Sequence, residues 1–127
     1  MAAASDYAEN LQLTWILTNN TATRPSARYI ALYTAAPSDT GGGTEVAGGS
    51  YARQVVTFSV TGNTASNSGT ITFPTATASW GTVNWVGIFD AVTGGNLLYW
   101  GQTTTGKIIN TGDTFQINNN NLIITLD

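Results

Sequence analysis

The fold of this chain is decided by the stretch TVNWVGIFDAVTGGNLLYWGQ, residues 82–102. Two runs rich in β-branched and aromatic residues, Thr82–Asp90 and Asn96–Gln102, are separated by Thr93-Gly94-Gly95. Adjacent glycines favour the tight turn of a β-hairpin, because glycine adopts the positive φ that such turns require. The stretch therefore predicts two antiparallel strands joined by a hairpin turn.

The rest of the chain after Pro25 has the same pattern of short strands separated by turn residues. Turns are expected at 111–113 and at the asparagine run 118–121. A break at 35–50, with Pro37 and five glycines, is expected to form a flexible surface loop. Seven or eight strands predict an all-β fold, a β-sandwich or jelly-roll knob. The other expected strands are Tyr29–Thr34, Gln54–Val60, Gly69–Phe73, Lys107–Ile109, Thr114–Ile117 and Leu122–Leu126.

One N-terminal helix is expected before the strands, at about residues 6–19. Asp6 is placed to cap it, and Glu9 completes a capping-box pattern three residues later. The whole chain, 1–127, is expected to form a single β-sandwich domain, with this helix packed on strands that run from about residue 28 to residue 127. The apolar positions of the helix are Tyr7, Leu11, Leu13, Trp15, Ile16 and Leu17.

Three of the expected strands are apolar on both faces, whereas a sandwich core covers only one face of a strand. A helix of about four turns is only ~20 Å long, so a second subunit is expected to cover the remainder. The alternative is that the helix and the long loop are sufficient. By simple alternation, the opposed faces are Tyr29, Ala31 and Tyr33 against Ile30 and Leu32; Val83, Trp85 and Phe89 against Val86 and Ile88; and Leu97 and Tyr99 against Leu98 and Trp100.

The composition argues against several classes of function. The chain has no cysteine and no histidine, so disulfides, thiolate metal sites and the usual general base are not available. Charged residues make up 9% of the chain and the net charge is −3, so the sequence lacks the basic patch that nucleic-acid binding requires. No stretch approaches the ~18 apolar residues of a membrane span, and no basic segment typical of a secretory signal precedes the helix. Synthesis in a bacterial cytoplasm without export is therefore expected, with neither nucleic acid nor membrane as partner.

The acidic residues do not form a recognisable catalytic or cofactor site. Asp90 and Asp113 lie in or beside expected turns, where aspartate is common for backbone reasons. The loop from Asp39 to Glu45 could supply two carboxylates to a calcium ion, but glycine-rich loops are more often simply flexible. No enzyme activity, metal or cofactor is expected. Arg53, one of four cations, is expected to pair with a carboxylate or bind backbone carbonyls.

The four tryptophans have two interpretations. Exposed rings would form a platform for sugars, and buried rings would belong to a core or a subunit interface. Burial is favoured for Trp15, Trp85 and Trp100, whereas Trp80 lies in the most loop-like context and is the best candidate for a contact. The candidate interface residues are Trp15, Tyr29, Tyr33, Trp80, Trp85, Phe89, Tyr99 and Trp100.

Several stretches together carry a family resemblance. They are YAEN (7–10), YIALYTAAP (29–37), GGTEVAGGSYARQ (42–54), FPTATASWGTV (73–83), GIFDA (87–91) and GGNLL (94–98). They resemble a family of small phage virion proteins, and the resemblance covers roughly residues 7–127. Some members are labelled tail fibre proteins, and others that look similar are capsid cement, or decoration, proteins that form trimeric knobs on the head.

This resemblance implies a homotrimer with a structural role in the virion and no catalytic residues. The favoured hypothesis is a cement protein on the capsid exterior, which binds the major capsid protein and stabilises the assembled head through several weak contacts acting together. The alternative is a tail-fibre or receptor-binding knob, with other tail proteins or a host-surface glycan as partner. Cement is favoured on the basis of the resemblance and because the chain shows no long β-helical or coiled-coil shaft.

Overall fold

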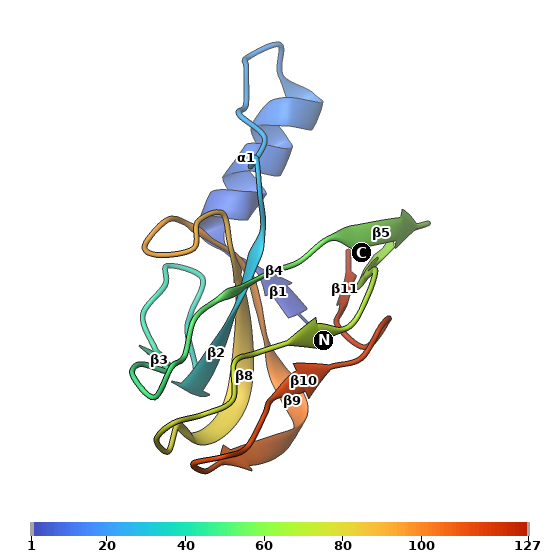
Figure 1. Cartoon of the computed structure of the whole chain (residues 1–127). Helices are drawn as coiled ribbons and strands as arrows, with labels where there is room; N and C mark the ends of the chain where they lie inside the picture. Colours follow the sequence, from blue (N-terminus) through green and yellow to red (C-terminus); the bar gives the residue numbers. More distant parts are fainter. Residues whose placement is uncertain (1, 127) are drawn as a thin grey trace.

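The hairpin predicted from residues 82–102 lies at the centre of the main sheet of the computed structural model, which describes residues 2–126 (Figure 1). Strands β8 (Gly81–Phe89) and β9 (Leu97–Ile109) pair antiparallel. Gly94 and Gly95 have φ values of 60° and 76° between them, as the tight turn requires. The expected hairpin is therefore confirmed.

The main sheet has the strand order β1-β9-β8-β2-β3, and every pairing in it is antiparallel. Strand β1 (Ala2–Ala4) pairs with β9 at one edge, and β2 (Tyr29–Ala35) lies on the other side of β8. The short strands β3 (Thr44–Glu45) and β4 (Gln54–Val55) both pair with β2. This sheet forms one layer of the molecule.

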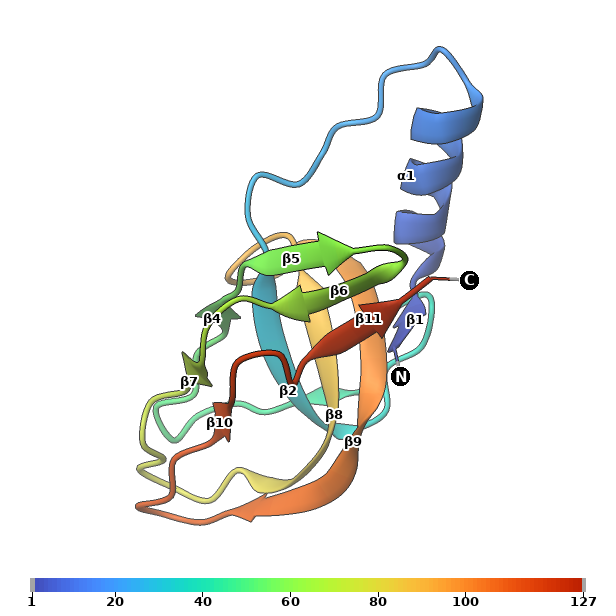
Figure 2. The same cartoon turned by 90° about the vertical axis from the view of Figure 1, so that its right-hand side faces the viewer.

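The second layer consists of two smaller antiparallel sheets, which lie across the main sheet in Figure 2. One has the order β11-β6-β5 and the other pairs β10 with β7. Apolar side chains from both layers form the core, so the molecule is an all-β sandwich. The bounds are β5 Phe58–Thr61, β6 Thr64–Asn67, β7 Ile71–Thr72, β10 Gln116–Ile117 and β11 Ile123–Thr125.

A buried asparagine holds the second layer together. The Asn67 amide donates to the carbonyl oxygens of Gly69 and Asn118 at 2.7 and 3.0 Å, and its Oδ1 accepts from the Leu122 N–H at 2.9 Å. All of its polar atoms thus have partners, as a fully buried amide requires. These bonds fix the expected turn at 118–121, in which Asn120 has a φ of 65°.

Several expected strand limits are corrected. The sequence signal missed β1, β3 and β6, and the expected strand Gln54–Val60 is divided into β4 and β5. The runs 96–102 and 107–109 belong to one long strand, β9. The supposed flexible loop at 35–50 contains β3 and the buried Val46, so part of it belongs to the fold.

Two register irregularities between β8 and β9 correct the expected strand faces. Val83 pairs with Lys107 and Trp85 pairs with Gln102, so β8 advances by two residues where β9 advances by five. As a result Val83 enters the main core, whereas Trp85 lies on the opposite face. A second irregularity at Ile88/Phe89 places Leu98 and Tyr99 on the core side, and Leu97 and Trp100 on the other side.

The outer face of the main sheet therefore carries its own apolar cluster, called here the outer cluster. Its buried members are Ala31, Tyr33, Phe89 and Leu97, with Trp85 and Trp100 packed at its margin. Tyr33 and Phe89 stack with their ring centroids 6.5 Å apart. Both faces of the central strands are thus apolar, as their sequences indicated.

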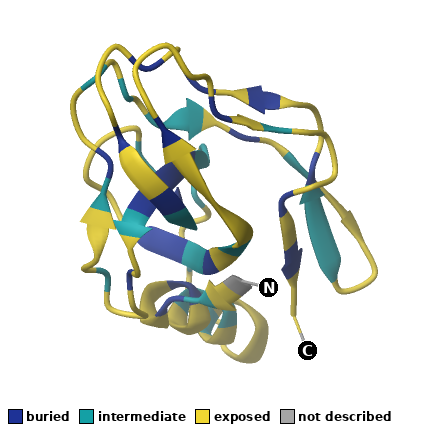
Figure 3. Ribbon diagram, turned by 90° about the horizontal axis from the view of Figure 1, so that it is seen from below, coloured by how far each residue is buried: buried dark blue, intermediate teal, exposed yellow. Residues whose placement is uncertain are grey.

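The single helix, α1 (Asp6–Leu17), begins and lies differently from the expectation. Ser5 caps it in place of Asp6: the Ser5 hydroxyl accepts from the Ala8 N–H at 3.2 Å and donates to the Leu97 carbonyl. The helix ends at Leu17, two residues earlier than expected. Its base packs on the sandwich through the buried Ala8, but its outer part projects from the sandwich (Figures 1 and 2), and the helix is largely exposed in Figure 3. Within residues 2–126, no helix has the length and apolar character needed to cross a membrane.

Candidate assembly surface

The outer half of α1 exposes large apolar side chains on several sides of the helix. Successive residues of a helix are separated by about 100° around its axis, so these side chains do not form one stripe. A helix that is apolar all round is normally enclosed by other structure. We call the four residues the α1 tip; they are Leu13, Trp15, Ile16 and Leu17, which are 57%, 68%, 71% and 71% exposed.

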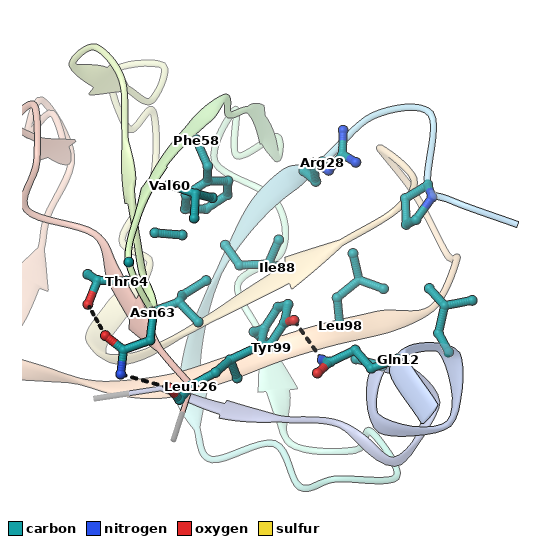
Figure 4. Close-up of a pocket in the computed structure, with 16 residues that line it drawn as sticks. Gln12, Arg28, Phe58, Val60, Asn63, Thr64, Ile88, Leu98, Tyr99 and Leu126 are labelled. Carbon is teal, nitrogen blue, oxygen red and sulfur yellow. Dashed lines mark hydrogen bonds between the residues drawn. The ribbon is translucent and has the colours of Figure 1, made fainter. Parts of the chain in front are cut away.

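An apolar groove opens beside the inner half of the helix (Figure 4). It has a volume of about 350 Å³ and lies between α1 and the layer formed by β5, β6 and β11. Ile88 and Leu98, which belong to the main core, line it, and so does the 72% exposed Val60. We call it the α1 groove. The core of the sandwich is thus incompletely covered at this end.

A second hollow continues this groove along the helix. It has a volume of about 500 Å³ and shares Leu11, Gln12 and Pro25 with the first. It extends to Trp15 and is bordered by Arg24 on the segment that returns from the helix to β2. The two hollows therefore form a continuous apolar path from the core to the α1 tip.

The base of α1 is fixed to β9 by hydrogen bonds. Gln12 Nε2 donates to the Tyr99 hydroxyl at 2.9 Å, as Figure 4 shows, and burial raises the pKa of that hydroxyl. The Ser5 N–H donates to the Leu98 carbonyl at 2.9 Å. The helix is therefore held at its base while its outer half has no contact that covers the tip.

Arg53 organises a polar network at the edge of the outer cluster. Its guanidinium binds both carboxylate oxygens of Glu45, each at 2.8 Å, and donates to the carbonyls of Ala91 and Gly94 at 2.9 and 2.8 Å. Its Cζ also lies 3.7 Å from the centroid of the Phe89 ring. The expectation that Arg53 pairs with a carboxylate or binds backbone carbonyls is confirmed on both counts.

The network shifts the pKa of its members in directions that follow from their contacts. Burial alone would raise the pKa of the Glu45 carboxyl, but hydrogen bonds from Arg53 and from the Tyr51 hydroxyl outweigh burial and hold this pKa below its ordinary value of 4.5. Burial, followed by the Glu45 charge, raises the pKa of Tyr33 to about 12, against an opposing effect of Arg53. The group is thus an ionised pair surrounded by neutral phenols at neutral pH.

The two carboxylates considered for calcium are engaged elsewhere. Glu45 belongs to the Arg53 pair, and Asp39 Oδ1 accepts from the Trp100 indole at 2.9 Å. Within residues 2–126 no group of three or more acidic, histidine or cysteine side chains is close enough to hold a metal ion. The calcium interpretation therefore has no support in this loop.

The structure separates the predicted interface residues into different environments. Trp85 and Trp100 lie together at the margin of the outer cluster, with ring centroids 6.1 Å apart. Tyr33 and Phe89 are buried in that cluster, Tyr29 is half-buried, and Tyr99 lines the α1 groove. Trp15, expected to be buried in a core or a subunit interface, is exposed on the helix in the single copy.

Trp80 is corrected from a loop-like contact residue to a core residue. It is 5% exposed, its indole donates to the Gly49 carbonyl at 2.9 Å, and it packs edge-on against Tyr51 with centroids 5.5 Å apart. Its neighbours Ala76 and Phe73 are also buried, although the segment that contains them is not a strand. An irregular backbone thus carries a buried aromatic ring here.

Sequence reasoning missed Leu13, Ile16, Leu17 and Val60 as surface residues. Their apolar character was visible, but their exposure depends on the direction in which α1 leaves the sandwich. The one signal in the sequence was that apolar residues occupy nearly every position at 13–17 instead of a single helical stripe.

Comparison with known protein families gives a match. The model of the family described as "Podophage GP4 fiber I protein gp80" matches residues 3–125, nearly the whole chain. No curated protein matches the chain.

Proposed function

The chain belongs to the podophage GP4 fiber I protein gp80 family of phage structural proteins, and on this premise we propose that it is a non-enzymatic subunit of a virion fibre that assembles as a homotrimer. The observation that supports an assembly role is the α1 tip, where four large apolar side chains are more than half exposed. Large apolar side chains exposed together in this way mark protein–protein contacts. The family description favours a fibre as the location.

A capsid cement role is the second candidate. The observation that favours it is the absence of an elongated shaft in the described part of the chain, which is a sandwich with one helix of 12 residues. A knob of this shape can bind directly to a capsid surface, with the major capsid protein as partner. In either role the protein acts through adhesion, and several linked copies make weak contacts effective.

The copy number per virion, measured by quantitative mass spectrometry of purified particles, separates the two roles. A few to a few tens of copies, with antibody labelling on the tail, is the result expected for a fibre. Hundreds of copies with labelling over the head would replace the fibre with the cement role. A stable monomer in sedimentation at micromolar concentration, together with absence from the particle, would contradict both.

A further inference from the structure

The chain contains two apolar surfaces that are complementary in shape. The α1 tip is a projecting set of large side chains, and the α1 groove with its continuation is an unfilled apolar path of about 350 and 500 Å³. Both surfaces are present once in every copy, so each copy offers one projection and one recess. This stoichiometry suits an assembly in which each copy fills the recess of the next.

The charges near the two surfaces also have opposite signs. Helix α1 carries Asp6 and Glu9 in its first turn and has no basic residue, whereas Arg28 and Arg24 border the groove and its continuation. Within residues 2–126 the only ion pair joins Arg53 to Glu45, so these four charges are not paired in one copy. Two acidic residues thus lie in the first turn of the projecting helix, and two arginines border the groove and its continuation.

The α1 tip cannot fill the groove of its own copy. Ala8, Leu11 and Gln12 already form the side wall of that groove, held there by the bond from Gln12 to Tyr99. Leu17 lies five residues beyond Gln12, or about 7.5 Å further along the helix axis at 1.5 Å per residue. The tip therefore extends away from the recess that its own base lines.

From these observations we propose that the α1 tip of one copy binds in the α1 groove of a second copy. The contact places Leu13, Ile16 and Leu17 against the apolar lining of the groove and brings Glu9 near the arginines of the second copy. Such a contact is head-to-tail, and three copies can close it into a ring. This inference rests on the proposed function, and it identifies a second copy of the chain as the partner of the α1 tip.

Disulfide trapping tests the contact cleanly because the chain has no native cysteine. Leu17→Cys chains are mixed with Val60→Cys chains that carry a distinguishing mass tag, so that any disulfide between residues 17 and 60 joins two copies. We expect this mixed dimer to form readily under mild oxidation. The matched control replaces Val60→Cys with Ile108→Cys, which is 65% exposed but lies outside the groove, and little mixed dimer is expected there.

A charge exchange provides a second, independent measurement. Arg28→Glu should weaken the trimer about two- to fivefold in dissociation constant, and adding Glu9→Lys to the same chain should restore it. Lys107→Glu makes the same charge change at an exposed site outside the groove and should leave the constant unchanged.

The outcomes separate the two proposals. A trimer that gives disulfides between two Leu17→Cys positions, and none between residues 17 and 60, would mean that the helices pack on one another, which overturns the groove contact and keeps the proposed function. A trimer with no response to the charge exchange and no mixed dimer overturns it as well. Absence of any oligomer, in solution and on the particle, would remove the proposed function itself.

Discussion

A single arginine joins three separate segments of the sandwich. Arg53 connects Glu45 on β3 with the carbonyls of the β8–β9 turn, and its side chain is only 7% exposed. Lysine cannot reproduce a planar, bidentate contact together with two carbonyl bonds. We therefore expect Arg53→Lys to lower the free energy of unfolding by about 1–3 kcal/mol, and Arg53→Ala by about 3–5 kcal/mol because it leaves the carboxylate unpaired.

Urea denaturation checks this expectation, with Arg24→Lys as the control because Arg24 is exposed. Equal unfolding midpoints for the original chain and Arg53→Ala would show that the network contributes nothing measurable.

The depressed pKa of Glu45 predicts a pH dependence of stability. Because the folded-state pKa lies below the unfolded value, the ionised carboxylate contributes stability above the unfolded pKa, and the contribution is lost as the pH falls through the lower folded pKa. The unfolding free energy should therefore fall on acidification below about pH 4.5. In Glu45→Gln this component should be missing, so the two curves converge at low pH. Parallel curves from about pH 6 to about pH 3 would contradict the assignment.

At the scale of the connecting elements, two adjacent glycines allow a matched comparison in the β2–β3 connection. Gly42 and Gly43 have nearly equal φ values of 76° and 74°. A Cβ on Gly43 would lie 2.7 Å from Pro37 N and 2.8 Å from the Ala35 carbonyl oxygen, whereas one on Gly42 would meet nothing within 4 Å. Both alanine variants incur the backbone strain of positive φ, about 1–2 kcal/mol. Gly43→Ala should lose about 1–3 kcal/mol more through overlap, as measured by thermal unfolding.

If Gly42→Ala proved as damaging as Gly43→Ala, backbone strain alone would explain both variants and the close approach to Pro37 would be irrelevant.

The sequence predicted those elements whose signal is local. Glycine pairs marked the hairpin turn, and alternating residues marked β8, β2 and β9. It did not predict β1, because Ala2–Ala4 carries no strand preference and is extended only through pairing with β9. The faces were assigned wrongly where an irregularity interrupts the alternation: Val83 was grouped with Trp85, and Leu97 with Tyr99, but each pair lies on opposite faces.

The candidate site was predicted less well than the fold. The helix at residues 6–17 follows from spacing and capping residues, but its direction is set by Ser5, whose hydroxyl and N–H bind carbonyls of β9. A local sequence pattern cannot predict contacts between residues that lie so far apart in the sequence. The same reason explains Trp80, whose burial depends on Gly49 and Tyr51.

At the scale of the whole molecule, two tryptophans should separate stability from assembly. Trp80→Ala should cost about 3–5 kcal/mol of unfolding free energy because it empties a core site. Trp15→Ala, at a position 68% exposed, should change monomer stability by less than about 0.5 kcal/mol and should instead weaken self-association. Chemical denaturation and sedimentation equilibrium measure the two quantities separately. A Trp15→Ala chain that assembles normally would exclude this ring from the contact.

The attachment of α1 to β9 also affects the order of folding. Ser5 and its partner Leu97 lie 92 positions apart in sequence, and a ribosome adding about 5–20 residues per second needs roughly 5–20 s to cover that interval. During this time the nascent helix has no β9 to fix its direction. The groove needs Ile124 as well, so it is completed only when the last strand leaves the ribosome. In the proposed contact, the groove of a chain can therefore accept the α1 tip of a neighbour only after its β11 has been made.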